Sequence, residues 1–364
     1  MKVLNKFAVL GVTASLLAGG AMLAAPAYAD PVTNGYVATG SDTLQDVMNA
    51  LANGTTITGA TVRATAAGNN FGSFDAFGSS TVQVKANGPY FTRPAGSGAG
   101  VTSLRASITG TAYGTTAAVI TGQVDIARSS SGPGTDASTT GQLLYVPFAR
   151  DAVAYAYKAA DSASATVLSS LTTAQLTAIY SAATPTVISG VTINPRLPQS
   201  ASGTRKFFLG AIAVSTVGAA VPTTDNTATG PAENDATILG SNQIIPFSVA
   251  SWVAQSNGAA PSTIGTTGVL IGSPTGVAPF TGTGSALLPN PTYYAGTTWG
   301  RDTYLVVQNA RVTSGDPLYD PNLAGLVTSL TSYGTFPSTP GAVKSKFGFQ
   351  APSTTATQRA FATL

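Results

Sequence analysis

The chain has 364 residues, of which 43% are hydrophobic and only 9% are charged, with 17 basic residues, 14 acidic residues, no His and no Cys. A chain of this apolar content can bury a large core, as one large domain or two domains, and is not disordered throughout. The absence of Cys and His excludes disulfides, Cys-ligated zinc, diacylglyceryl attachment at a cysteine, and a Ser-His-Asp triad.

The first 29 residues have the pattern of a secretory signal peptide. Lys2 and Lys6 precede an apolar run over residues 7–23, and Ala27-Tyr28-Ala29 fits a cleavage site before Asp30. Cleavage after Ala29 leaves 15 basic and 14 acidic residues (17 − 2 against 14), whereas a general nucleic-acid binder has a clear basic excess. We therefore expect an extracytoplasmic protein, secreted or held in the cell envelope, with no lipid anchor and no second membrane-spanning run.

The first predicted unit of the mature chain is a strand, a tight turn and a helix. Residues 36–40 form an apolar strand ending in glycine, Ser41-Asp42-Thr43 follow, and apolar residues then recur at helical spacing from Leu44 to Leu51. Hydroxyl groups and free N–H groups at a helix start favour an anion. A plain helix cap accounts for the turn equally well, with Asp42 as the capping residue.

Two further polar turns follow. Arg93 lies just before a glycine-rich turn with Ser97 and Gly98, which opens a helix through Val101, Leu104 and Ile108. The strand 124–127 ends in Arg128-Ser129-Ser130. The first turn lacks the Lys and the Ser or Thr of a phosphate-cradling P-loop, and an ordinary polar turn explains the second.

The most informative stretch is Ser200 to Phe208, which reads as another helix start. Ser202 is a good N-cap, Gly203 allows close approach of a ligand, Thr204 adds a hydroxyl, and Arg205 offers a planar fork for phosphate or carboxylate. The alternative is a capped surface helix with an exposed arginine.

The remaining elements indicate an α/β protein. We predict strands at 143–148 and 152–157 around Arg150-Asp151, a capped helix at 171–180, a strand leading into a helix at 244–253, and a strand at 303–307. A helix follows around Leu323 to Leu330, and the segment 342–364 is predicted to be a loop and a short final helix. Strands that alternate with helices favour this class, in which ligands collect at the carboxyl ends of strands.

Together, four glycine- or serine-rich turns, three with an arginine nearby, predict one oxyanion site. The chain resembles the phosphate-binding receptors of ABC transporters, which are type II periplasmic binding proteins, and in particular a secreted actinobacterial branch. The stretches that carry the resemblance are Gly40 to Thr43, Gly96 to Gly100, Val124 to Ser130, Leu171 to Tyr180 and Ser202 to Arg205.

The resemblance implies two α/β lobes joined by two crossing strands, with the ligand between them. Lobe 1 would comprise 30–148 and 299–364, lobe 2 would comprise 149–298, and the first crossing would lie in the region from Tyr145 to Tyr157. It implies that Thr43, Ser97, Ser202, Gly203 and Thr204 donate hydrogen bonds to phosphate. The full set of predicted ligand-binding residues is Ser41, Asp42, Thr43, Arg93, Ser97, Gly98, Arg128, Ser129, Ser130, Ser202, Gly203, Thr204 and Arg205.

The sequence departs from the receptor pattern at two site positions. Ser130 stands where such receptors place a carboxylate that accepts the ligand's proton, so Asp42, Asp75, Glu233 or Asp235 would have to replace it. Pro198 stands where they place an arginine, which leaves Arg196 or Arg205 for that role.

The predicted function is capture of phosphate or a related oxyanion for uptake through an ABC permease, by a monomer without catalytic residues, metal or cofactor. The alternatives are a secreted surface or adhesive protein that keeps the fold without transport, and a phosphatase-type hydrolase. The hydrolase is disfavoured because the sequence also lacks Ser-x-x-Lys and Gly-x-Ser-x-Gly motifs.

Overall fold

The structure, a computed structural model, describes residues 31–57, 59–65, 70–265, 268–333 and 339–361. The predicted signal peptide and its cleavage site lie outside these residues. Within the described part of the chain, no helix combines the length and the apolar character needed to cross a membrane.

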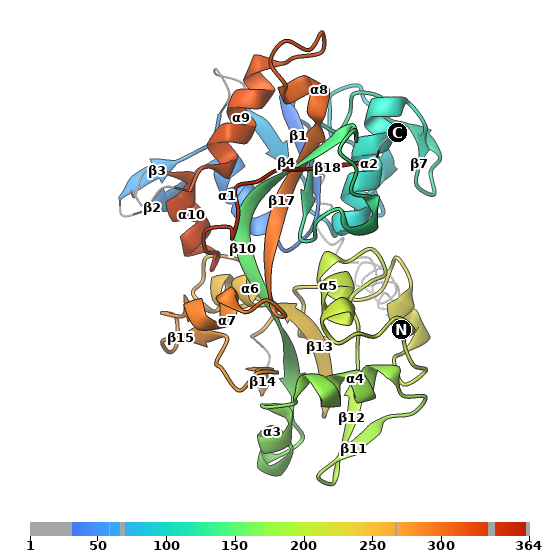
Figure 1. The fold of residues 1–364 in the computed structure, drawn as a ribbon, viewed down its shortest axis with the longest axis vertical. Helices are drawn as coiled ribbons and strands as arrows, with labels where there is room; N and C mark the ends of the chain where they lie inside the picture. The colour runs from blue at the N-terminus through green and yellow to red at the C-terminus, as the bar shows by residue number, and fades with distance from the viewer. Residues whose placement is uncertain (1–30, 58, 66–69, 266–267, 334–338, 362–364) are drawn as a thin grey trace, which may run out of the picture. The chain divides into compact units, whose positions relative to one another are not determined.

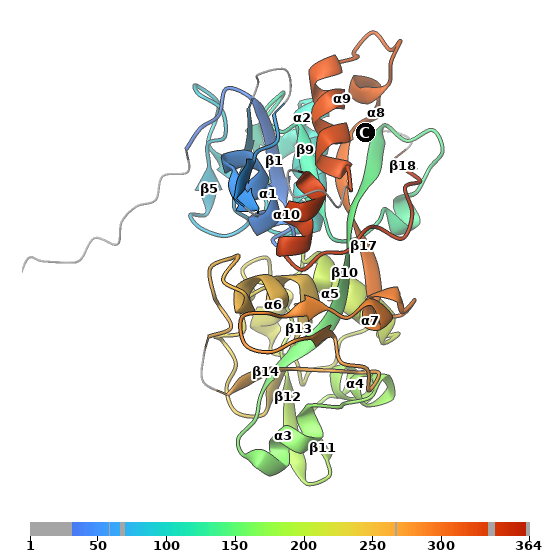
Figure 2. The same ribbon diagram turned by 90° about the vertical axis from the view of Figure 1, so that its left-hand side faces the viewer.

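The described residues form two α/β lobes joined by crossing strands (Figures 1 and 2). The first lobe contains the early part of the chain and its end. Its strands and helices are β1 (Tyr36–Gly40), α1 (Gln45–Asn53), β2 (Thr55–Ile57), β3 (Ala60–Val62), β4 (Phe71–Ser73), β5 (Thr81–Val82), β6 (Phe91–Thr92), α2 (Ser97–Thr109), β7 (Ala112–Tyr113), β8 (Ala118–Val119), β9 (Ile126–Ser129), α8 (Asn309–Val312), α9 (Pro321–Thr331), α10 (Pro340–Lys346) and β18 (Gln358–Ala360), with a 3-10 turn η1 (Gly134–Asp136).

The second lobe is built from the middle of the chain. Its elements are α3 (Ser162–Leu168), α4 (Thr173–Ser181), β11 (Thr186–Ile188), β12 (Val191–Pro195), α5 (Gly203–Ala211), the 3-10 turn η2 (Thr223–Asn226), β13 (Gln243–Ser248), α6 (Val249–Ser256), β14 (Val269–Gly272), β15 (Phe280–Thr281), β16 (Leu288–Pro289) and α7 (Pro291–Ala295).

Two long strands connect the lobes. β10 (Leu143–Lys158) is continuous, where the sequence suggested two strands, and β17 (Gly300–Gln308) pairs with its first part, from Leu143 to Ala152. The second part of β10 pairs with β13 and β14 of the second lobe. β10 thus runs from one lobe into the other, as the central green strand of Figure 1 shows. The exact lobe boundaries predicted from the sequence remain a prediction.

The main sheet among the described residues has the order β11-β12-β13-β10-β17-β9-β1-β4, with β14 and β18 also paired to β10. Alternate residues of its strands face different cores, because successive side chains of a strand point to opposite faces. Ala38, Ile126 and Leu305 pack with α1, α9 and α10, whereas Val37 and Ala127 pack with α2. Helices therefore cover both faces of the first lobe's sheet.

The second lobe has its own core, formed by residues between Ala152 and Trp299. α6 lies where the lobes meet, since Ala250 and Ala254 pack in a first-lobe cluster while Trp252 and Val253 pack in the second. The end of the chain differs from the sequence prediction. The helix α10 comes first and the strand β18 follows it, because Leu143 to Tyr145 of β10 offer an edge on which the chain pairs.

Candidate functional site

The candidate site lies between the lobes, where the turn after β1 meets the start of α5. β1 and β9 are parallel neighbours, so their carboxyl ends bring Ser41 to Thr43 beside Ser130. In the second lobe, the side chain of Ser202 caps α5 by accepting from the Arg205 N–H at 3.0 Å, as the sequence predicted. The two hydroxyls Thr43 Oγ1 and Thr204 Oγ1 are 3.3 Å apart across the lobes.

At the turn after β1, α1 begins at Gln45 and has no side-chain cap. The side chains of Ser41, Asp42 and Thr43 are all buried, and they turn to a residue of the other lobe instead of to the helix. That residue is Glu233.

The carboxylate of Glu233 occupies the point where the donors converge. Its Oε1 accepts from Thr43 Oγ1 at 2.8 Å, and from the Thr43 N–H and Ser41 Oγ, each at 3.3 Å. Its Oε2 accepts from the Thr204 N–H at 3.1 Å and from Ser202 Oγ. A side chain of the protein thus accepts hydrogen bonds from five groups, all of which belong to four residues predicted to bind the ligand.

Arg301, at the start of β17, is the cation of this site. Its Nη2 donates to Thr204 Oγ1 at 2.7 Å and to Thr43 Oγ1 at 3.3 Å, and it contacts Asp151 Oδ2 at 2.8 Å. Its Nη1 is buried and finds no hydrogen-bond partner among the described residues. The sequence reading missed Arg301 because it lies almost 100 residues from the Ser-Gly-Thr-Arg stretch. An available signal was the Arg-Asp pattern in both crossing strands, 150–151 and 301–302.

Asp42 completes the site as a second buried carboxyl. Its Oδ2 accepts from the Glu233 N–H at 3.0 Å, and its Oδ1 has no partner among the described residues. Burial, together with the nearby negative charge of Glu233, raises the pKa of Asp42 well above its usual range.

The pKa of Glu233 is shifted in the opposite direction, downward. Its burial opposes ionisation, but hydrogen bonding with Asp42, the charge of Arg301 and the hydroxyls of Ser202 and Thr43 lower the pKa of Glu233 to about 2. The two pKa shifts together favour the proton on Asp42 and the negative charge on Glu233. A single negative charge at this point is what the donors and Arg301 stabilise.

Ser97 and Ser130 lie beside this centre and against α5. Their hydroxyls are 3.1 Å apart, and the Ser130 N–H donates to Ser97 Oγ at 3.0 Å. A Cβ on Gly203 would overlap both hydroxyl oxygens, so α5 can begin this close to the first lobe only with glycine at its first position. Ser129 donates from Oγ to the Ser131 carbonyl and shapes the turn.

The three arginines of the predicted ligand set are bound elsewhere. Arg128 is buried and donates to the carbonyls of Gly40, Ser41 and Phe74 and to Ser73 Oγ. Arg93 bonds to the 75–79 segment. Arg205 donates to Pro198 O and Asp225 O, while Arg196 forms two bonds to the Asp225 carboxylate, so both fix the segment before Glu233.

The acidic candidates also separate in the structure. Glu233 and Asp42 lie in the site. Asp75 accepts from Asn49 Nδ2 at 2.7 Å, and Asp235 accepts from the N–H and the hydroxyl of Thr237, so within the described part of the chain neither bonds with the donors of the site.

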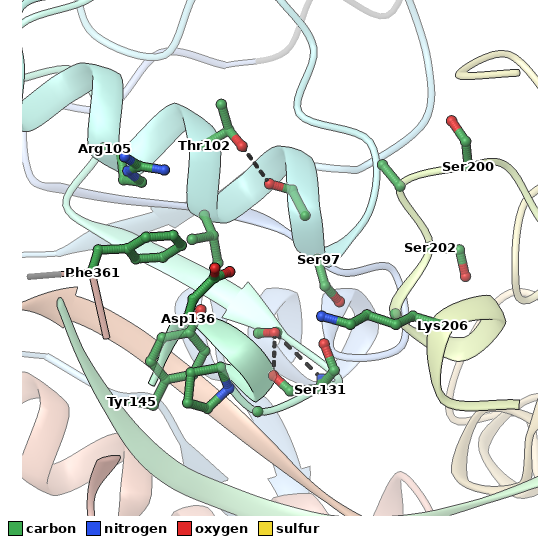
Figure 3. Close-up of a pocket in the computed structure, with 17 residues that line it drawn as sticks. Ser97, Thr102, Arg105, Ser131, Asp136, Tyr145, Ser200, Ser202, Lys206 and Phe361 are labelled. Atoms are coloured by element: carbon green, nitrogen blue, oxygen red, sulfur yellow. Dashed lines mark hydrogen bonds between the residues drawn. The ribbon is translucent and has the colours of Figure 1, made fainter. Parts of the chain in front are cut away.

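A cavity of about 450 Å³ opens beside the site between the lobes (Figure 3). Ser97 of the first lobe and Ser202 and Gly203 of the second lobe line it, and Lys206 extends from α5 toward Ser97 and Ser131. Gly98 also lines it, and its N–H donates to Ala201 O of the second lobe at 3.2 Å. Gln199 Nε2 donates to Ala95 O at 3.0 Å, so two hydrogen bonds connect the lobes near the cavity.

No protein-family model matches the chain, and the comparison with curated proteins finds no match. Among solved structures, the chain is similar to an ABC-type phosphate transport receptor from Vibrio cholerae, with 15% identity, a TM-score of 0.48, and coverage of 87% of this chain and 100% of the other. It is also similar to a putative phosphate ABC transporter substrate-binding protein with bound phosphate from Clostridium perfringens (14% identity, TM-score 0.49, coverage 87% and 99%). A third similar structure is that of a phosphate-binding protein from Stenotrophomonas maltophilia, with 13% identity, a TM-score of 0.49, and coverage of 88% of this chain and 91% of the other. Because these TM-scores lie below 0.5, the function proposed below rests on the geometry of the site.

Proposed function

We propose that the protein is an extracytoplasmic receptor that binds phosphate or a related small oxyanion between its lobes and delivers it to an ABC permease. The observation that carries the proposal is the convergence of donors from both lobes on one carboxylate group, with Arg301 donating to the hydroxyls of Thr43 and Thr204 beside it. A carboxylate and a phosphate are recognised by the same hydroxyl, N–H and guanidinium donors. These donors support an oxyanion site, and the position of the Glu233 carboxylate supports placing the anion among them.

The position of the donors also supports a binding mechanism. Ser41 and Thr43 belong to the first lobe, whereas Ser202 and Thr204 belong to the second, so an anion held by both pairs stabilises the closed arrangement. A ligand that contacts both lobes shifts the equilibrium between open and closed forms toward the closed form. A permease would then recognise that closed form.

We propose no catalytic role. The sequence has no His or Cys, and the described residues contain no group of three or more Asp, Glu, His or Cys that could hold a metal ion. The groups of the site are hydrogen-bond donors and one ionised carboxylate, which suit recognition of an anion.

The test is isothermal titration of the purified protein with phosphate and with sulfate, in the wild type and in Thr43→Val. Thr43→Val keeps the shape of the side chain and removes a donor, so we expect phosphate binding to weaken by about tenfold to a hundredfold, the loss typical of a hydrogen bond to a charged group. Thr328→Val is the matched control, because Thr328 is exposed on α9 and bonds only within that helix. Equal affinities in the wild type and Thr43→Val would contradict the site.

A second candidate is a secreted surface protein that keeps this fold without transport. One observation favours it: Glu233 bonds with the donors of both lobes, so these donors have an acceptor within the protein itself. Absence of heat and of a thermal shift with either anion, in both the wild type and a variant without Glu233, would favour this candidate over the receptor.

A further inference from the structure

Glu233, which the sequence offered as one of four acidic candidates, fills the centre of the proposed oxyanion site. Its two oxygens accept from Ser41, Thr43, Ser202 and Thr204, which fully uses the acceptor positions of a carboxylate. An external anion needs these same donors. Two negative groups cannot share them in a buried site, because like charges repel strongly where water is excluded.

Glu233 also connects the lobes. It lies on the connection between η2 and β13, which is tied to the second lobe by the Gln199 N–H donating to Pro231 O at 2.9 Å and by Gln255 Nε2 donating to Asn234 O at 2.9 Å. From these anchors its carboxylate and its N–H reach Ser41, Thr43 and Asp42 of the first lobe. Moving the lobes apart would break these bonds while the anchors at Pro231 and Asn234 stay in place.

Two buried polar atoms at the same site are left without a partner among the described residues. They are Arg301 Nη1 and Asp42 Oδ1. Buried polar groups are almost always paired, so such atoms indicate that the carboxylate does not satisfy the whole site. Phosphate and sulfate have four oxygens where a carboxylate has two, and can reach additional donors.

We propose that Glu233 is an internal ligand of the cleft, which holds the empty protein closed and which an incoming oxyanion must displace. This inference rests on the proposed oxyanion site and adds its regulation. The protein then differs from a receptor whose empty cleft stands open. The apparent affinity for the anion is reduced by the fraction of molecules in which Glu233 has left the donors.

The experiment compares wild type, Glu233→Ala, Glu233→Gln and Asp235→Ala. Asp235 is the matched control, because it lies on the same connection and its carboxylate bonds, among the described residues, only to Thr237. Each purified protein is titrated with phosphate and with sulfate by isothermal calorimetry. The separation of the lobes is followed, without and with anion, by small-angle X-ray scattering, and circular dichroism checks the fold.

We expect Glu233→Ala to bind phosphate about tenfold or more tightly than wild type, since the free site no longer competes with an internal anion. Its scattering without ligand should show a larger radius of gyration, which returns to the wild-type value with phosphate. Glu233→Gln keeps the shape of the side chain but loses its charge, so it should tighten phosphate binding and increase the radius of gyration by smaller amounts. It replaces Glu233→Ala in the comparison if that variant fails to fold. Asp235→Ala should match the wild type.

The outcomes separate this inference from the function on which it rests. Unchanged or weaker phosphate binding in a folded Glu233→Ala, with unchanged scattering, would overturn the internal ligand and leave the receptor in place. A variant that opens but binds neither anion would keep Glu233 as the closing contact and would refute the oxyanion receptor.

Discussion

Arg301 and Asp151 lie directly opposite each other on the two strands that cross between the lobes, and they form a buried ion pair with Nη2 and Oδ2 2.8 Å apart. The other oxygen of Asp151 accepts from Ser248 Oγ and from the Ala250 N–H, each at 3.0 Å. The carboxylate of one crossing strand therefore orients the guanidinium of the other toward Thr43 and Thr204. The connection between the lobes and the anion site are thus one hydrogen-bonded network.

The first prediction concerns this pair. Arg301→Met leaves Asp151 buried without its cation, so we expect the free energy of unfolding to fall by about 3–5 kcal/mol. The measurement is urea unfolding followed by circular dichroism. The control is Lys206→Met, because Lys206 is exposed and forms no ion pair among the described residues, and its loss should change stability by less than about 0.5 kcal/mol. A similar small effect for Arg301→Met would show that the pair does not stabilise the fold.

The second prediction concerns the contact between α5 and the first lobe. Gly203→Ala places a methyl group on Ser97 Oγ and Ser130 Oγ, so the lobes can no longer close fully. We expect a larger radius of gyration by X-ray scattering and weaker phosphate binding. Gly210→Ala on the same helix is the control, because nothing lies within 4 Å of its added Cβ. It should stabilise the protein by about 0.5–1 kcal/mol, the preference of a helix for alanine over glycine. If Gly203→Ala and Gly210→Ala had the same radius of gyration and the same phosphate affinity, the steric argument would be contradicted.

The third prediction is the acid dependence that Glu233 contributes. Its pKa is lowered to about 2 in the folded protein from an ordinary value of 4.5, so the folded state favours the ionised form. The corresponding stability is present above pH 4.5 and is lost as the pH falls toward 2. It amounts to about 3 kcal/mol at most. Urea unfolding between pH 3 and 7 should show the stability difference between wild type and Glu233→Gln shrinking as the pH falls. A constant difference would exclude a lowered pKa.

The fourth prediction is the pH dependence of the stability linked to Asp42, which is opposite to that of Glu233. The pKa of Asp42 is raised by burial and by the charge of Glu233, so the folded state binds its proton more strongly than the unfolded state does. The stability linked to Asp42 is present below pH 3.8 and is lost as the pH rises through its folded pKa. Asp42→Asn keeps an oxygen for the Glu233 N–H and cannot ionise. Its stability relative to wild type should therefore rise with pH, and a decrease between pH 4 and 8 would contradict the assignment.

The sequence by itself was sufficient for the local elements of the site. The periodicity after Thr43 and the cap at Ser202 predict where α1 and α5 begin, because capping and apolar spacing depend on neighbours in the chain. The crossing strands around 143–157 and 303–307 were predicted for the same reason. Their apolar runs, which are rich in Val and Tyr, are local signals of strands. Only the structure shows that the first run is one uninterrupted strand.

Tertiary structure alone decided which charged groups meet. Arg93, Arg128 and Arg205 stand close to the predicted turns in sequence, but their guanidinium groups bond to carbonyls of neighbouring loops, whereas Arg301 reaches the site from a distant strand. The sequence offered Glu233 as one of four acidic candidates, and its position against Ser41 and Thr43 depends on how the lobes close over nearly 200 residues of intervening chain. Side-chain contacts across such distances are set by packing of the whole fold, which no local pattern encodes.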